Sequence, residues 1–320
     1  MLIDTAQYLR LPAAPIRVRP ILDIHVSEQA FLPSVDILLS DWVATIATPA
    51  FKLIRQQQGP QAAFCSIGTG VGLDVLAAIE TLEATRVGIT DVHESVVSAA
   101  AENIRRNLNN PDDVAIEAGY GDLLEPLAPG GAVPPRFDLI YENLPNIPVA
   151  DAQDATVARK SSGHIPPRTE AIPGLMRQNL LALHYLALLK AKDFLTPGGA
   201  VLSLIGGRIP LSVFQEMGQL AGYRSEIFTY GWKIQTDPVE IITGHLRQQE
   251  EGFGPYHFYR AARLSEAFEG ICLENSGTQA QTLERQLAPD ALSPAEALAA
   301  LQQGEIIGHT VVALRSVLDR

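Results

Sequence analysis

Two glycines separated by one residue, Gly68 and Gly70, follow an apolar run and precede an apolar-periodic stretch. Glycine lets the backbone turn tightly and lets a ligand approach where a Cβ would exclude it. The start of the helix that follows adds N–H groups with no partner inside the helix, and these can face the ligand. About twenty residues further on, a second short apolar run ends in Asp91, where a carboxylate can hold the hydroxyls of a ribose. The spacing therefore predicts a site for an adenosine-containing cofactor.

Strand-like and helix-like stretches alternate from residue 61 to about 260, which predicts a parallel sheet with helices on both faces. The expected strands are the run before Gly68, then 86–91, 114–118, a run from 136 into the turn at 143–146, 200–205, 225–230 and 239–245, with 256–259 as a further candidate. Helices are expected from 73, over 94–107 and over 175–194. The stretch 147–174 lacks periodicity and is expected to be a mobile lid or a disordered insert.

The pattern divides the chain into three parts: 1–58, 59–264 and 265–320. In the first part, apolar residues between 35 and 43 follow the helical period. That helix either packs on the main domain or forms a lid in which Phe31 and Trp42 exclude water from the site. The last part is rich in Ala, Gln, Glu and Leu, with a capped helix from Ser293 and another expected over 305–318. We interpret it as a helical appendage for packing or for contact within a homodimer.

Net charge, hydropathy and cysteine content indicate which kinds of partner the protein binds. The formal charge is −12 over 320 residues, and nucleic-acid binding needs a basic face, so a small-molecule substrate is favoured. Neither a secretion signal nor an apolar stretch of membrane-spanning length is visible, which favours the cytoplasm and no membrane partner. The two cysteines, Cys65 and Cys272, are too few for a disulfide framework, and no cluster has metal-ligand spacing. Cys65 is expected to be a small buried hydrophobe.

The motifs in their order resemble the class I S-adenosylmethionine-dependent methyltransferases over residues 61 to about 262. The resemblance implies a Rossmann-like seven-stranded sheet and S-adenosylmethionine as cofactor. It places Gly68 and Gly70 against the methionine end, Asp91 on the ribose and Asp122 near the adenine amine. The expected cofactor-binding residues are Ser66, Gly68, Thr69, Gly70, Asp91, Gly121, Asp122 and Asn143. Over 137–260 the sequence is most similar to the N-terminal domain of plant methionine S-methyltransferase.

Two departures from that family bear on the reaction. Ser66 stands where the family often has an acidic residue that holds the methionine ammonium, and a serine lacks that charge. Relatives that modify bases or glutamine have Asn-Pro-Pro-aromatic after the fourth strand, whereas this chain has Leu144 and Asn146 at the second and fourth places. A planar target loses its stacking platform there. Modification of DNA, RNA or release factors is therefore disfavoured.

The remaining chemistry involves an amino-acid-sized nucleophile. Attack by the cofactor's own α-amine on its γ-carbon would give azetidine-2-carboxylate and methylthioadenosine, as in the azetidine-2-carboxylate synthases that this chain resembles. Ser66 favours this cyclisation, because a neutral amine is easier to form without a carboxylate beside it. Methyl transfer to sulfur or nitrogen of a small molecule is the alternative. A non-catalytic S-adenosylmethionine-binding protein and a nicotinamide dinucleotide enzyme are further alternatives.

Candidate side chains follow from their positions at strand ends. Asn143 and Ser203 are expected to accept hydrogen bonds from the amine, and Arg208 and Asn146 to bind substrate, with Arg208 either clamping a carboxylate or simply solvated. Three aromatic residues are candidates for cation–π contact with the sulfonium: Tyr141, Tyr185 and Trp232. For Tyr185, core packing is the alternative role. His164, in the stretch 147–174, is either a base or an ordinary loop residue.

Overall fold

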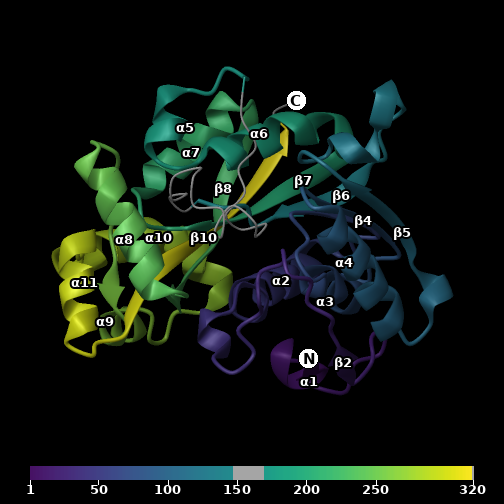
Figure 1. The fold of residues 1–320 in the computed structure, drawn as a ribbon, viewed down its shortest axis with the longest axis horizontal. Helices are drawn as coiled ribbons and strands as arrows, with labels where there is room; N and C mark the ends of the chain where they lie inside the picture. The colour runs from purple at the N-terminus through teal and green to yellow at the C-terminus, as the bar shows by residue number, and fades with distance from the viewer. Residues whose placement is uncertain (147–168, 319–320) are drawn as a thin grey trace.

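A mostly parallel sheet runs through the centre of the computed structural model, which describes residues 1–146 and 169–318 (Figure 1). Its seven strands lie in the order β5-β4-β3-β6-β7-β10-β8, and a short eighth strand, β9, pairs with β10. The strands are β3 (Ala63–Ile67), β4 (Arg86–Asp91), β5 (Ala115–Tyr120), β6 (Phe137–Glu142), β7 (Leu195–Gly206), β8 (Tyr223–Ile234), β9 (Tyr259–Arg260) and β10 (Ile307–Leu318). Strand β10 is antiparallel to β7, β8 and β9. The predicted Rossmann-like α/β fold is confirmed.

Helices cover both faces of this sheet. They are α2 (Thr48–Gln58), α3 (Leu73–Thr81), α4 (Glu94–Asn107), α5 (Gly174–Gln178), α6 (Ala182–Ala191), α7 (Leu211–Leu220), α8 (Pro238–Glu250), α9 (Ala261–Ala267), α10 (Leu273–Leu287) and α11 (Pro294–Gln302). Short 3-10 turns occur at Leu38–Ser40, Pro111–Asp113, Glu125–Leu127, Pro129–Gly131, Lys192–Phe194 and Ala288–Asp290. The predicted helix over 175–194 is thus divided into α5, α6 and a 3-10 turn.

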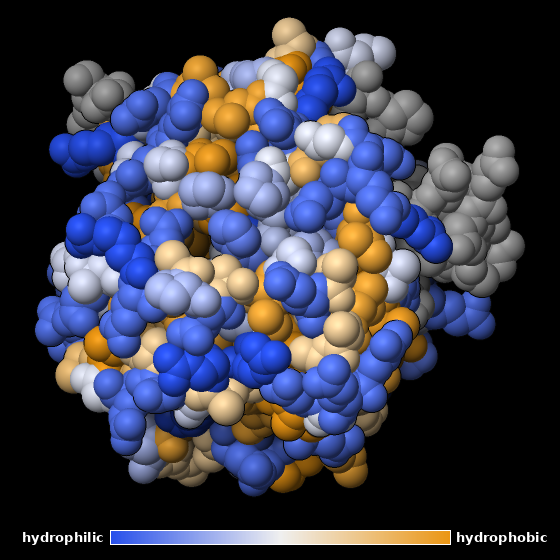
Figure 2. Space-filling view, turned by 90° about the vertical axis from the view of Figure 1, so that its left-hand side faces the viewer, coloured by the Kyte–Doolittle hydropathy of each residue, from blue (hydrophilic) through white to orange (hydrophobic). Residues whose placement is uncertain are grey.

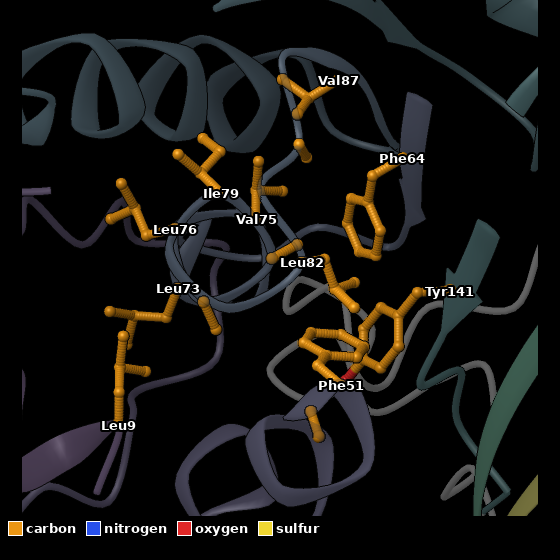
Figure 3. Close-up of a cluster of buried hydrophobic side chains, with 14 of the residues drawn as sticks. Leu9, Phe51, Phe64, Leu73, Val75, Leu76, Ile79, Leu82, Val87 and Tyr141 are labelled. Carbon is orange, nitrogen blue, oxygen red and sulfur yellow. The ribbon is translucent and has the colours of Figure 1, made fainter. Parts of the chain in front are cut away.

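Alternation along the strands divides the buried side chains into two cores. Phe64 points into a first core with α2, α3 and α4, where the rings of Phe51 and Tyr141 lie beside it (Figure 3). Its neighbour Cys65, which is fully buried as expected, belongs to a second core with α6, α7 and α10. Successive side chains of a strand point to opposite faces, so a central strand covered on both sides is apolar throughout. Both cores therefore fix the ends of the parallel strands relative to one another.

The N-terminal part is less helical than the sequence suggested. Strands β1 (Leu2–Asp4) and β2 (Ile21–Asp23) form a two-stranded antiparallel sheet with the short helix α1 (Thr5–Tyr8). The expected helix around residues 35–43 is wrong, because the Asp41 side chain accepts hydrogen bonds from the backbone N–H groups of Val43 and Ala44 and so caps a new start. A π-helical turn, Val43–Ala47, then leads into α2.

Two predictions in the C-terminal third are also wrong. Residues 305–318, expected as a helix in a helical appendage, contain β10, which lies between β7 and β8 inside the sheet. It carries a run of buried apolar residues on both faces, and such a run has no alternation to distinguish it from a helix. Residues 239–245, expected as a strand, belong to α8, which Pro238 begins at its first position.

The face over α8, α9 and α11 carries mainly hydrophilic residues with hydrophobic ones scattered between them (Figure 2). Val239 on α8 is one such exposed apolar residue, with 64% of its surface accessible. Within residues 1–146 and 169–318 no helix has the length and apolar character needed to cross a membrane.

Candidate active site

A cavity of about 250 Å³ lies where β3, β4 and β6 end. Strand order reverses at β3, which has β4 on one side and β6 on the other. Open parallel sheets bind ligands at the carboxyl ends of the strands beside such a reversal. The residues that line the cavity are as far apart in the sequence as Tyr8 and His309.

The predicted glycine turn forms part of this wall. The backbone N–H groups of Gly68 and Thr69 both donate to the Thr90 carbonyl, at 2.8 and 3.0 Å, and thereby tie the turn to the end of β4. Gly70 has a φ of +53°, and a Cβ built there would meet no atom within 4 Å. Backbone conformation rather than crowding therefore requires glycine at this position, and the side facing the cavity stays open to a ligand.

Two of the predicted carboxylates also line the cavity. Asp91 ends β4 and is 3% exposed, and its Oδ1 accepts a hydrogen bond from the His93 N–H at 3.2 Å. The Asp91 carbonyl accepts from the Gly121 N–H at 2.8 Å, which brings the turn after β5 alongside. Asp122 follows in that turn and lines the same cavity. The structure thus brings together residues predicted from three separate strand ends.

Ser66 contacts a carboxylate beside the glycine turn. Its hydroxyl donates to Oδ2 of Asp74 on α3, and Asp74 Oδ1 accepts from the Val75 N–H at 2.9 Å. Asp74 is 4% exposed and lines the cavity. Burial raises its pKa to about 7, against the opposing effect of its hydrogen bonds. The premise that no acid stands here is therefore wrong, because the acid comes from α3 instead of β3.

The N-terminal part covers one side of the cavity. Phe31 and Trp42, the two residues named in the lid hypothesis, contribute to the wall. The Tyr8 hydroxyl donates to Asp41 Oδ1 at 2.8 Å, and the Ser34 N–H donates to Asp41 Oδ2 at 3.0 Å. Asp41 therefore joins α1, the preceding loop and the π-helical turn at the cavity. No local sequence motif around Tyr8 or Asp41 predicts that these residues line a site.

The turn after β6 is held by a buried acid–imidazole pair. Glu142 and His184 are both fully buried, and His184 Nδ1 lies 2.8 Å from Glu142 Oε2. The same oxygen accepts from the Leu144 N–H at 3.2 Å, while Asn146 Nδ2 donates to the Gly206 carbonyl at 3.0 Å. These contacts place Asn143 in the cavity wall. The helical period of α6 gave no sign of this role for His184.

A basic end of the cavity, formed by Arg208, Lys233 and His309, lies at β7, β8 and β10. Arg208 is 3% exposed, and its Nη2 donates to Gln235 Oε1 at 2.7 Å. Burial lowers the pKa of Arg208 to about 9, which leaves it charged at neutral pH. Lys233 is 1% exposed, and its Nζ lies 5.0 Å from the centre of the Trp42 ring. Burial and then the Arg208 charge lower the pKa of Lys233 to about 7.

His309 supplies an uncharged ring at the basic end. It pairs across the strands with Lys233, and its Nδ1 lies 2.8 Å from the Thr310 carbonyl. Burial, followed by the charges of Arg208 and Lys233, holds its pKa well below the ordinary range. Because a carbonyl can only accept, Nδ1 carries the proton and Nε2 is an acceptor. Prediction missed His309 because residues 305–318 were assigned to a helix.

Ser66 is fully buried and does not line the cavity, and three further predicted site residues lie elsewhere. Ser203 is fully buried within β7, and Tyr185 packs in the second core, which was its alternative role. Trp232 packs with a third cluster around Tyr259 and Leu264. None of the three belongs to the described cavity wall, whereas Tyr141 does.

Tyr141 stands edge-on to Phe51 at 5.3 Å, so its ring is also part of the first core (Figure 3). His164 lies outside the described residues, as do residues 147–168 of the expected lid. No group of three or more His, Cys, Asp or Glu side chains within 1–146 and 169–318 could hold a metal ion.

Comparisons with known proteins give structural likeness only. The chain matches no protein-family model, and the comparison with curated proteins gives no match. It is similar to the crystal structure of the YcgJ protein from Bacillus subtilis, with 12% identity and a TM-score of 0.45 over 85% of this chain and 99% of that one.

A methyltransferase from Pyrococcus furiosus is similar with 18% identity and a TM-score of 0.36 over 64% of this chain and 80% of that one. The ribosomal protein L11 methylase from Lactobacillus delbrueckii subsp. bulgaricus is similar with 17% identity and a TM-score of 0.35, over 57% and 70%. With identity this low, function has to be argued from the side chains of this chain.

Proposed function

We propose that this chain is an S-adenosylmethionine-dependent enzyme and that the cofactor binds in the cavity at the ends of β3, β4 and β6. The observation that carries this proposal is the convergence of the glycine turn, Asp91 and Asp122 on one cavity. An adenosine with a ribose fits carboxylates at these strand ends, and the open side of Gly70 fits a ligand close to the backbone. The cofactor supplies an activated sulfonium, so the protein has to orient a nucleophile and exclude water.

The reaction we favour is cyclisation of S-adenosylmethionine. The α-ammonium loses one proton, the amine nitrogen bonds to the γ-carbon, and the bond from that carbon to sulfur breaks. The products are azetidine-2-carboxylate and methylthioadenosine. Asp74 supports this reaction, because a buried carboxyl with a pKa near 7 beside the glycine turn can accept that proton at neutral pH. Cyclisation is therefore favoured by the presence of the Asp74 carboxyl, whose pKa burial raises, and not by the absence of an acid at Ser66.

Methyl transfer to a small acceptor is the second candidate. The basic end of the cavity favours it, because Arg208, Lys233 and His309 lie around β7, β8 and β10, away from the strands that carry the glycine turn and Asp91. That arrangement offers polar groups to a second molecule. In this reaction the acceptor's sulfur or nitrogen takes the methyl group and the cofactor leaves as S-adenosylhomocysteine.

Incubation of the purified protein with S-adenosylmethionine alone separates the two reactions. Equal amounts of methylthioadenosine and the cyclic imino acid, above the rate of spontaneous breakdown, are expected from cyclisation. The Asp74→Asn variant should then lose at least about tenfold in rate, because it cannot take up the proton. S-adenosylhomocysteine that forms only after small sulfur or nitrogen nucleophiles are added would overturn cyclisation. Binding with neither product would indicate a non-catalytic protein.

A further inference from the structure

The Arg208 guanidinium is built into the cavity wall with part of its hydrogen-bonding capacity unused. One nitrogen, Nη2, donates to Gln235. Among the residues that the structure describes, Nε and Nη1 are buried and have no hydrogen-bond partner. A guanidinium carries five N–H donors and no acceptor, and buried donors are almost always paired in native proteins. The unpaired nitrogens of a residue that is 3% exposed therefore point to a ligand group that accepts.

Within the part of the chain that the structure describes, no carboxylate balances the charge of Arg208. No acidic side chain of the described residues lies within ion-pair distance of Arg208, and its ring neighbour is Phe258 at 5.7 Å. Asp41, which also lines the cavity, already accepts from Tyr8 and three backbone N–H groups. Asp237 lines the cavity near Lys233, whose charge it favours. A buried cation without a counterion is costly, so an anionic ligand completes the site.

The strand end that precedes Arg208 leaves room for this side chain. A Cβ built on Gly206 would fall 2.2 Å from Arg208 Nη1. The Gly206 carbonyl is in turn held by Asn146, which comes from the turn after β6. The absent side chain at 206 therefore permits the guanidinium to lie against the backbone and inside the wall. Such a fixed donor set loses little conformational freedom when it binds a planar anion.

We propose that Arg208 binds the carboxylate of an amino-acid-sized ligand at the basic end of the cavity, an inference that rests on the proposed function. A carboxylate has two oxygens for the remaining N–H donors and one charge for one guanidinium. It has two sources: the amino-acid moiety of S-adenosylmethionine itself, as cyclisation would require, or a separate amino-acid acceptor, as methyl transfer would require. His309 Nε2, an acceptor at the same end, is available to an N–H group of that ligand.

Calorimetric titration distinguishes the two sources. In the first arm, the wild-type protein is titrated with S-adenosylmethionine and with its decarboxylated analogue. If the cofactor's carboxylate binds Arg208, the wild type prefers the intact cofactor by at least tenfold, and Arg208→Gln reduces this preference to about twofold or less. In the second arm, protein saturated with S-adenosylhomocysteine is titrated with L-methionine and L-methioninamide. A preference for the acid that Arg208→Gln abolishes would assign the carboxylate to an acceptor.

Arg263→Gln is the matched control, because Arg263 on α9 is exposed and paired with Glu266 and Asp290. It should keep every preference of the wild type. The proposal is overturned if neither arm shows a carboxylate preference in the wild type, or if every preference survives in Arg208→Gln. Cofactor binding without such a preference would refute this inference and leave the proposed function intact. Absence of any binding of S-adenosylmethionine to the wild type would refute both the inference and the proposed function. This last measurement uses the wild type alone, so it does not depend on the folding of a variant.

Discussion

Asp74 and Arg208 illustrate how burial changes an ionisable group in opposite directions. Desolvation disfavours the charged form, so it raises the pKa of the Asp74 carboxyl and lowers the pKa of the Arg208 guanidinium. The ordinary pKa of a carboxyl is so far below that of a guanidinium that the two groups differ in protonation at neutral pH even after these shifts. Asp74 exchanges its proton around neutral pH, whereas Arg208 keeps its charge. Asp74 is therefore suited to proton transfer and Arg208 to holding an anion.

The Asp74→Asn substitution should change how stability depends on pH. The folded pKa of Asp74 lies above its unfolded value, so its contribution is fully present below the unfolded pKa and is lost as pH rises through about 7. His245 and His309, whose pKa values are lowered, act in the opposite direction in both proteins and cancel in the comparison. Between pH 5 and 8 the wild type should lose on the order of 2 kcal/mol relative to the variant.

Urea unfolding of the ligand-free proteins at several pH values measures this difference. The Asn side chain keeps one acceptor oxygen for the Val75 N–H, and its NH2 group can donate to the Ser66 hydroxyl, which also accepts, so packing changes little. Parallel stability profiles for the two proteins would show that the Asp74 carboxyl titrates as it does in water.

Replacing Arg208 by methionine should stabilise the ligand-free protein. Methionine fills a similar volume without an uncompensated buried charge, and the gain should be about 1 kcal/mol or more after the loss of the Gln235 contact. The same change at exposed Arg263 should alter the free energy of unfolding by less than about 0.5 kcal/mol. Thermal unfolding of both variants measures the effect, and a clear loss of stability in Arg208→Met would mean that the guanidinium is satisfied without a ligand.

Several of the predicted residues that line the cavity lie at strand ends or in the glycine turn. Gly70, Asp91 and Asn143 could be predicted because strand ends and turn chemistry are local signals. Trp232 was predicted to be a site residue, but its neighbour Lys233 lines the cavity instead. The two are neighbours in β8 and point to opposite faces, and only the pairing with β10 decides which side faces the ligand.

Among the elements, the N-terminal part depends on one carboxylate. Tyr8→Phe removes the hydroxyl that donates to Asp41 and should cost about 2 kcal/mol of stability, because hydrogen bonds to charged groups are the stronger ones. Affinity for the adenosine cofactor should fall in parallel, since both residues line the cavity. Tyr120→Phe, at a residue 59% exposed, is the control and should change neither quantity. Equal stability of the two variants in urea would contradict this role.

Strand β10 is a core element, and substitution tests this directly. Val312 is fully buried between β7 and β8, so Val312→Ala should cost about 2 kcal/mol. Val239→Ala, at an exposed position of α8, should stay within about 0.5 kcal/mol. Chemical unfolding of the two variants compares them. A small effect at Val312 would return residues 305–318 to the role of an appendage.

Across the whole molecule, the cavity couples distant parts of the chain. Because Tyr8, Asp91, Lys233 and His309 share one wall, a ligand there should stabilise the fold as a unit. S-adenosylhomocysteine at 100 times its Kd should add about 2.7 kcal/mol and raise the Tm by several degrees. Calorimetry should show one shifted transition, and Asp91→Asn should lose most of the shift. An unchanged Tm in the wild type would count against cofactor binding in this cavity.

The fold class followed from the alternation of strands and helices, but the sheet's final order did not. Sequence order explains the neighbours β3–β4, β4–β5 and β6–β7, whereas β6 crosses over to the other side of β3. The basic end depends on β10, which is far along the chain from β7 and is apolar on both faces. No local signal assigns such a strand to a particular gap in a sheet.

The position of β10 also sets an order of events during synthesis. The ribosome completes β7 and β8 well before β10, yet these two strands are not paired with each other in the finished sheet. Until β10 emerges, each presents an unpaired edge, and such edges invite pairing with other chains. The nascent protein therefore passes through a stage in which the cavity wall lacks His309 and the sheet is open between β7 and β8. Holdase chaperones that mask strand edges would act at that stage, on a ribosome-bound chain that already contains the whole glycine turn.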